Sequence, residues 1–177
     1  MESIEILDRK FRLYIPEAEI SAEVNRLASE LTRDYQGKDP LLMPILNGSF
    51  MLAADLVRAM PMDCDVSFVK MQSYSGMQSS GEVKELMGFS EKVEGRHVVL
   101  VEDIVETGIS MEYTLKELWK RKPASVAICT FFFKPHLFHR DFSVDYVGRS
   151  IGDDFIVGYG LDYNGKGRTY KDVYVVE

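Results

Sequence analysis

The spacing of apolar residues predicts strands and helices in alternation along the chain. Short apolar runs at 4–7 and 12–15 predict two strands close to the first residue. A helix is predicted from Pro16, a residue typical of a first helical turn, to about Tyr35. One face of this helix carries apolar residues at three- and four-residue spacing, namely Ile20, Val24, Leu27, Leu31 and Tyr35.

Two strand-helix-strand units follow. The first is predicted from strand 41–46, helix 50–60 and strand 63–71, and the second from strand 98–102, helix 109–122 and strand 125–133. Because two parallel strands need a long crossover, usually a helix, these units predict an α/β fold with a twisted, mainly parallel sheet flanked by helices. The polar stretch 72–81 between them is predicted as a functional loop. Short strands are expected near 144–147, 155–157 and 173–176.

Length and composition predict one soluble domain over residues 1–177. Of the 177 residues, 46% are hydrophobic and 28% are charged, which excludes disordered, collagen-like and coiled-coil classes. A net charge of −7 argues against nucleic acid or an anionic membrane as a partner, so a phosphate ligand needs a local site. The longest uncharged stretch, 41–54, is interrupted by Pro44, Asn47 and Gly48 and is too short for a membrane helix.

Cysteine use and the first residues indicate a reducing compartment. Cys64 and Cys129 lie in apolar runs, without CxxC spacing or a nearby pair of histidines. Two free thiols are therefore favoured over a disulfide or a zinc site. Residues 1–5 lack the basic and apolar regions of a secretory signal, so we expect a cytoplasmic protein.

The segment 98–110 carries the clearest chemistry. An apolar strand is predicted to end at the adjacent carboxylates Glu102 and Asp103, and the chain then turns through Thr107 and Gly108 into a helix. Ligands of open α/β sheets bind at the carboxyl ends of strands, and the start of a helix offers N–H groups to a phosphate. Carboxylates can accept hydrogen bonds from a sugar diol. The alternative interpretation is that these acidic residues only favour the helix dipole.

Four segments, in this order and spacing, resemble those of one enzyme family. The string 102–110 resembles the phosphoribosyl pyrophosphate signature of the type I phosphoribosyltransferases. Segments 45–49, 73–74 and 155–168, the last with Lys134, resemble the pyrophosphate loop, the lid and the purine side of the hypoxanthine and hypoxanthine-guanine branch. The resemblance covers nearly the whole chain. It implies the type I phosphoribosyltransferase fold, in which the terminal segments form a small hood.

The resemblance also implies how the sugar donor is bound. Glu102 and Asp103 would hold the ribose hydroxyls, directly or through Mg²⁺. The 5-phosphate would be wrapped by Glu106, Thr107, Gly108, Ile109 and Ser110. Pyrophosphate would be bound by Asn47, Gly48 and Arg168. A lid carrying Ser73 and Tyr74 would close over the site and exclude water.

The purine would be bound by residues late in the chain. Lys134 would donate to the 6-oxygen, and because an ammonium group only donates, a 6-amino group would face another donor. This mismatch predicts 6-oxopurines over adenine. Phe155 would stack on the base, Ile156 would offer backbone hydrogen bonds, and Asp162 would lie on the purine side and ligate a second Mg²⁺. The alternatives are a solvated lysine, a core phenylalanine and a plain turn at 162–165.

Two residues depart from the family pattern. Glu106, the implied general base at purine N7, stands where the family usually has aspartate, and its extra methylene must fold back to place the carboxylate equally. Asn47 stands where a basic residue is common, which weakens the expected grip on pyrophosphate.

The predicted function is transfer of the 5-phosphoribosyl group to N9 of hypoxanthine, and also of guanine, in purine salvage. The alternatives are an enzyme that prefers xanthine or has guanine as its main acceptor, and a catalytically weak regulator that senses phosphoribosyl pyrophosphate or a nucleotide. The resemblance implies a homo-oligomer, either a dimer or a tetramer. Trp119 and the aromatic run 131–133 are candidates for the core or for its interface.

Overall fold

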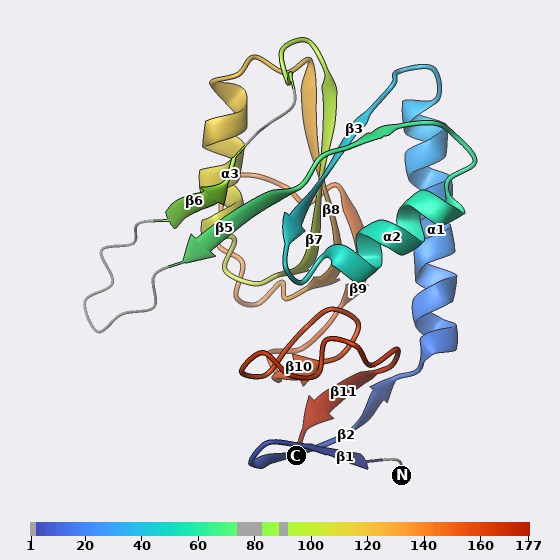
Figure 1. Ribbon diagram of the computed structural model, residues 1–177, viewed down its shortest axis with the longest axis vertical. Coiled ribbons are helices and arrows are strands. Elements are labelled where there is room, and N and C mark those ends of the chain that lie inside the picture. Colours follow the sequence, from blue (N-terminus) through green and yellow to red (C-terminus); the bar gives the residue numbers. More distant parts are fainter. Residues whose placement is uncertain (1–2, 74–82, 89–91) are drawn as a thin grey trace.

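The computed structural model describes residues 3–73, 83–88 and 92–177, and within them the chain builds two sheets (Figure 1). The larger sheet has the strand order β6-β5-β3-β7-β8-β9, and β4 also pairs with β3. Its pairs are parallel except for β5 with β6. The strands are β3 (Leu41–Leu46), β4 (Asp65–Val66), β5 (Val69–Ser73), β6 (Val83–Met87), β7 (His97–Val105), β8 (Ser125–Phe133) and β9 (Tyr146–Ser150).

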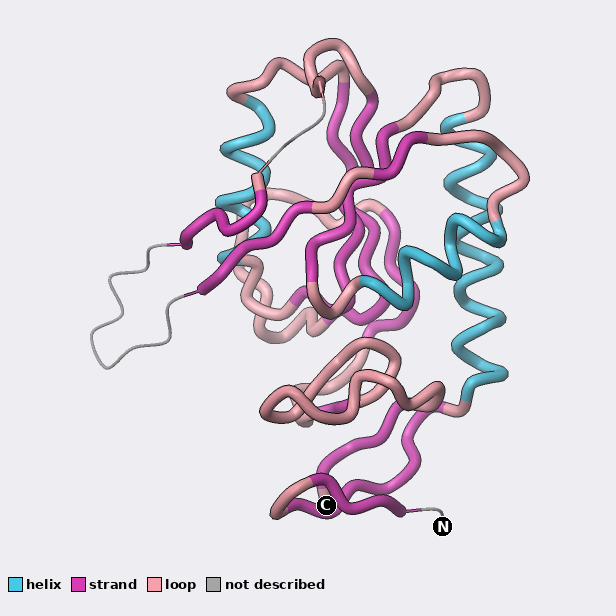
Figure 2. The backbone as a smooth tube through the Cα atoms, in the orientation of Figure 1, coloured by secondary structure: helices cyan, strands magenta, loops and turns pink. Residues whose placement is uncertain are grey.

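Helices cover both faces of this sheet, because its central strands are apolar on both sides. Figures 1 and 2 show α1 (Glu17–Tyr35) and α2 (Phe50–Ala59) on one face and α3 (Ile109–Trp119) on the other. Successive side chains of a strand point to opposite faces. On β7, Val99 and Val101 accordingly pack with α1 and α2, whereas Val98 and Leu100 pack with α3.

The two ends of the described chain form a second, antiparallel sheet, which we call the hood. Its strand order is β1-β2-β11-β10. These strands are β1 (Ser3–Ile6), β2 (Arg9–Ile15), β10 (Ile156–Val157) and β11 (Val173–Val176). Figure 1 shows the hood below the carboxyl end of β3. Together, the mainly parallel sheet, its flanking helices and the hood confirm the predicted fold class.

Several predicted bounds were wrong for identifiable reasons. Strand β7 continues through Glu102 to Val105, because β8 extends alongside it and pairs Val105 with Phe133. The predicted strand 63–71 is two strands, β4 and β5, which pair with different parts of β3. Strand β6 was not predicted, because its short sequence, VKELM, lacks a clear alternation of apolar and polar residues.

The predicted aromatic candidates divide between core and surface. Phe131 and Phe132 are buried in the core beneath α1 and α2. Trp119, by contrast, is 53% exposed at the end of α3, and that helix stops there rather than continuing to residue 122. Cys64 and Cys129 are free thiols, as predicted. In the described ranges, none of the helices has the length and apolarity to cross a membrane.

Candidate active site

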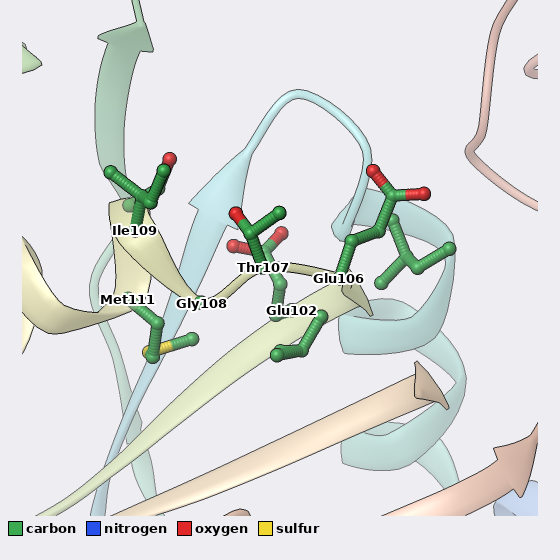
Figure 3. A pocket seen from close by; sticks show the side chains of 9 residues that line it. Glu102, Glu106, Thr107, Gly108, Ile109 and Met111 are labelled. Atoms are coloured by element: carbon green, nitrogen blue, oxygen red, sulfur yellow. The ribbon is translucent and has the colours of Figure 1, made fainter. Parts of the chain in front are cut away.

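The turn from β7 into α3 lines a cavity of about 200 Å³ (Figure 3). Its walls are Glu102 and every residue from 104 to 111. Figure 3 shows Glu106 and Thr107 where the strand gives way to the turn, and Ile109 and Met111 on the first turn of α3. The first N–H groups of a helix have no partner within it, so they can bind an anion. The structure thus gathers the whole predicted 5-phosphate segment around one space.

Arg140, a residue that the sequence analysis did not identify, braces this turn. Its Nε donates to the carbonyl oxygen of Thr107 at 3.0 Å, and its Nη1 donates to Oε2 of Glu112 on α3 at 3.0 Å. Arg140 therefore ties the turn to the helix that follows it. No local motif marks this residue, because the carbonyl it contacts lies 33 residues earlier.

A second cavity, of about 250 Å³, adjoins the first. Glu102 and Ser110 line both cavities. The other walls of the second cavity are residues 45–48, Asp103, Asp162 and Arg168. The structure therefore brings the predicted pyrophosphate residues next to the predicted ribose carboxylates.

Glu102 and Asp103 place two adjacent carboxyl groups at the second cavity, and the pKa of each is raised. Burial, followed by the charge of Asp103, raises the pKa of Glu102 well above its ordinary value. Burial also raises the pKa of Asp103, although hydrogen bonds and the charge of Arg168 oppose this shift. Hydrogen-bond donors or a cation at this place would stabilise the ionised pair.

The loop after β3 approaches these carboxylates closely. A Cβ atom on Gly48 would lie 1.5 Å from Oδ2 of Asp103, so only glycine fits there. The preceding Leu46-Asn47 peptide bond is cis, and the Asn47 side chain is exposed. Ser49 closes the loop, because its Oγ donates to the carbonyl oxygen of Ile45 at 2.6 Å.

Lys134 and Glu106, the predicted base-binding cation and the predicted general base, contact each other directly. Nζ of Lys134 donates to Oε1 of Glu106 in an ion pair, and it also lies 3.4 Å from the carbonyl oxygen of Asp153. Lys134 is only 4% exposed, so it is not a solvated surface lysine. Its backbone N–H donates to the carbonyl oxygen of Val105 at 3.0 Å, which brings the ends of β7 and β8 together.

Phe155 lies at the edge of the hood and is 40% exposed. Its ring contacts the rings of Phe11 and Tyr163, with centroids 6.4 and 5.8 Å away. Ile156 is buried in β10. Phe155 is thus supported from behind while part of its ring stays accessible. Sequence analysis missed the two supporting rings, because Phe11 is far from Phe155 in the chain and Tyr163 belongs to a segment that also suits a turn.

Asp162 and Arg168 form an ion pair at the second cavity, with 2.6 Å between Oδ1 and Nη2. Oδ2 of Asp162 accepts the N–H of Gly165 at 2.6 Å, which is the turn geometry given as the alternative. Nη1 of Arg168 donates to the carbonyl oxygen of Gly160 at 2.7 Å. Asp162 therefore both closes a turn and orients Arg168.

Part of the predicted site lies outside what the structure describes. Ser73 ends β5, but its side chain and the whole of Tyr74 fall outside the described residues. Over residues 3–73, 83–88 and 92–177, no three or more His, Cys, Asp or Glu side chains gather in a way that could hold a metal ion. A metal at Glu102 and Asp103 would need further ligands from substrate or water.

Comparison with known proteins identifies the family. The phosphoribosyl transferase domain matches residues 16–164. The hypoxanthine-guanine phosphoribosyltransferase of Aquifex aeolicus (strain VF5) is 38% identical over 98% of both chains. The hypoxanthine phosphoribosyltransferase of Escherichia coli (strain K12) is 41% identical over 84% of this chain and 85% of its own. This chain belongs to the hypoxanthine and hypoxanthine-guanine phosphoribosyltransferases.

Solved structures agree with this family assignment. A hypoxanthine-guanine phosphoribosyltransferase from Bacillus anthracis has a TM-score of 0.89 and 33% identity, covering 98% of this chain and 100% of its own. A hypoxanthine phosphoribosyltransferase from Staphylococcus aureus has a TM-score of 0.89 and 34% identity, covering 94% and 91%. The resemblance stated from the four sequence segments is thereby confirmed, and membership of this family does not favour the regulator.

Proposed function

We propose that this chain transfers the 5-phosphoribosyl group of phosphoribosyl pyrophosphate to N9 of hypoxanthine, and also of guanine, in purine salvage. The observation that carries the proposal is the pair of adjoining cavities, which share Glu102 and Ser110. One cavity offers a helix start to a phosphate, and the other offers Arg168 to a second anion. A sugar that carries a phosphate at one end and a pyrophosphate at the other matches this arrangement.

The ribose would lie where the two cavities meet. Oxygen atoms of Glu102 and Asp103 can accept hydrogen bonds from the two ring hydroxyls. The 5-phosphate would bind the N–H groups of the first turn of α3 and the hydroxyls of Thr107 and Ser110. Pyrophosphate would lie against the loop residues Asn47 and Gly48 and against the guanidinium of Arg168.

Residues Glu102 and Asp103 fit a magnesium ion, with Asp162 as a ligand at a second site. Carboxylate oxygens are the ligands that Mg²⁺ prefers, and it usually takes one or two of them together with substrate oxygens and water. The raised pKa values of Glu102 and Asp103 mark a partly buried pair of carboxyl groups whose ionised form a cation would stabilise. When bound, Mg²⁺ would neutralise charge on the departing pyrophosphate.

The base would displace the contact between Lys134 and Glu106 and take both groups as partners. Nζ of Lys134 would donate to the 6-oxygen, and the carboxylate of Glu106 would accept the proton from N7. The C1′–O bond to pyrophosphate breaks with its electron pair leaving on pyrophosphate, and N9 supplies the pair for the new C1′–N9 bond. Glu102 and Asp103 would stabilise positive charge on the ribose as the old bond breaks first.

The chain is further proposed to act in the cytoplasm as one domain, 1–177, in a dimer or tetramer. The free thiols Cys64 and Cys129 support a reducing compartment. The exposed indole of Trp119 supports an interface on the outer side of α3.

The first test is a steady-state assay with Mg²⁺, phosphoribosyl pyrophosphate and one of hypoxanthine, guanine, xanthine or adenine. We expect turnover with hypoxanthine and guanine, and a kcat/KM for adenine lower by about 10⁴-fold, because its 6-amino group would face Lys134. The same assay without Mg²⁺ is the control for the metal. Turnover with none of the four bases would refute the proposed function.

A further inference from the structure

Tyr159 has a backbone conformation that disfavours a side chain. It lies in a turn of three successive residues with positive φ, since Gly158 has φ 100°, Tyr159 has φ 47° and Gly160 has φ 97°. Glycine is the usual residue in this left-handed region, because a Cβ atom crowds the backbone there. A tyrosine at the centre of such a turn therefore points to a role for its side chain.

The side chain of Tyr159 is anchored in the core of the molecule. It is 4% exposed, its ring centroid lies 5.1 Å from that of Phe131, and its hydroxyl donates to Oδ2 of Asp55 at 2.9 Å. Asp55 lies in α2, the helix that starts directly after loop 47–49. Hydrogen bonds from Phe50 to Asn47 and from Ala53 to Ser49 join that loop to the helix.

The backbone of turn 158–160 contacts two walls of the second cavity, which are Gly48 and Arg168. A Cβ atom on Gly160 would lie 2.0 Å from the carbonyl oxygen of Gly48, so the two backbones are in contact. On the other side, the carbonyl oxygen of Gly160 accepts from Arg168 at 2.7 Å. The position of this turn therefore sets the spacing between loop 47–49 and the guanidinium.

We propose that Tyr159 is a positioning residue for the pyrophosphate end of the donor. Its hydrogen bond to Asp55 ties the turn 158–160 to α2, and so holds loop 47–49 and Arg168 at the separation that pyrophosphate requires. The contacts of Phe155 with Phe11 and Tyr163, and of Lys134 with Glu106, involve neither Tyr159 nor Asp55. Loss of the bond should therefore weaken donor and pyrophosphate binding more than base binding.

The test is isothermal titration of the whole protein with pyrophosphate and MgCl₂, which needs no turnover. Tyr159→Phe removes only the hydroxyl. We expect its Kd for pyrophosphate to rise by about tenfold, because loop 47–49 and Arg168 are no longer held at the separation that pyrophosphate requires. In the kinetic assay, the KM for phosphoribosyl pyrophosphate should rise equally, while the KM for hypoxanthine stays within about twofold.

The chain provides a matched control in Tyr146. Its hydroxyl donates to Oδ2 of Asp34 at the same distance, 2.9 Å, but joins β9 to α1 away from both cavities. Tyr146→Phe should lower Tm without changing the Kd for pyrophosphate.

Variants of Asp55 test the other partner of the hydrogen bond. Asp55→Asn keeps an acceptor oxygen and should bind pyrophosphate nearly as the wild type does, whereas Asp55→Ala should match Tyr159→Phe. The double variant of Tyr159→Phe and Asp55→Ala should be no weaker than either alone.

An unchanged Kd in Tyr159→Phe, with a fall in Tm like that of Tyr146→Phe, would overturn the inference and leave Tyr159 a purely structural residue. Equal increases in the KM values of donor and base would also overturn it. The inference rests on the proposed function, since that function identifies pyrophosphate as the ligand. Failure of the proposed function and failure of the role of Tyr159 can be told apart. An inactive wild type contradicts the function, whereas the titration with pyrophosphate reports on Tyr159 alone.

Discussion

At the scale of single residues, the contact between Lys134 and Glu106 is the most informative feature of the site. Each was predicted from its place in a short string, but their pairing was not, because they lie 28 residues apart. The buried ammonium of Lys134 pairs with the carboxylate of Glu106 and lies 3.4 Å from the carbonyl oxygen of Asp153. A purine that binds Glu106 deprives Lys134 of its carboxylate partner. The purine must then offer another acceptor to Nζ of Lys134, and a 6-oxygen provides one.

Lys134→Met tests this exchange while keeping most of the side-chain volume. We expect the KM for hypoxanthine to rise by about 10²-fold, because the 6-oxygen loses a charged donor, and the KM for the donor to change little. The relative preference for hypoxanthine over adenine should fall as well. Lys166→Met, a change at an exposed residue, is the control. Equal losses for base and donor would contradict the assigned contact.

Glu102 offers a prediction about pH and stability. Its pKa is raised in the folded protein, so the unfolded chain releases this proton at a lower pH than the folded chain does. The free energy of unfolding should therefore fall as the pH rises above about 4.5. Glu102→Gln removes the ionisation and should raise Tm at neutral pH by roughly 3 °C, the shift expected for ~1 kcal/mol in a domain of this size.

Scanning calorimetry from about pH 5 to pH 8 would measure this effect, and Tm should decline less with pH in the variant than in the wild type. Glu5→Gln is the control, since its side chain is 73% exposed and its pairing with Lys10 is worth little. A Tm for Glu102→Gln at or below the wild-type value at neutral pH would show that the ionised carboxylate does not destabilise the fold. Turnover should fall in the same variant, because a neutral amide does not stabilise positive charge on the ribose as the carboxylate would.

At the scale of elements, the strands and helices that follow one periodicity were predictable and the contacts between loops were not. Strands β3, β8 and β11 have the predicted bounds, because their apolar runs end at polar or turn residues. Strand β7 was predicted too short, since its last residues carry carboxylates and only pairing with β8 keeps them extended. Tertiary pairing here overrides local preference.

Arg140 lets the bracing of the phosphate turn be tested. Arg140→Met removes the hydrogen bonds to Thr107 and Glu112. We expect the KM for phosphoribosyl pyrophosphate to rise by about tenfold, because the turn is no longer tied to α3. Lys116→Met is a matched control, since Lys116 donates to the other oxygen of Glu112 at 2.8 Å but is not bonded to the turn. If both variants bind the donor equally, the brace has no role.

At the scale of the whole molecule, the hood joins the two ends of the chain to complete the purine side. Its four strands come from residues 3–15 and 156–176. The sequence predicted those strands individually, and only the resemblance predicted that they share a sheet. Contacts such as Phe11 with Phe155 join residues too far apart for any local pattern to reveal.

Phe11 provides a test of this long-range support. Phe11→Leu should lower Tm and raise the KM for hypoxanthine by several-fold, because the ring behind Phe155 is lost. Donor binding should be nearly unchanged. Leu27→Val, in the buried face of α1, is the control and should lower Tm while leaving both KM values alone. An unaltered KM for base in Phe11→Leu would show that Phe155 needs no such support.

The pairing of β2 with β11 also sets the order in which the site can be completed during synthesis. Val176 pairs with Phe11, and Val173 pairs with Ile15, so the inner edge of the first hairpin has no partner until the ribosome has translated residues 173–176. The strand-helix-strand units can pair as they emerge, because their contacts are closer in sequence. A nascent chain arrested before β11 would therefore carry the phosphate turn but no completed hood.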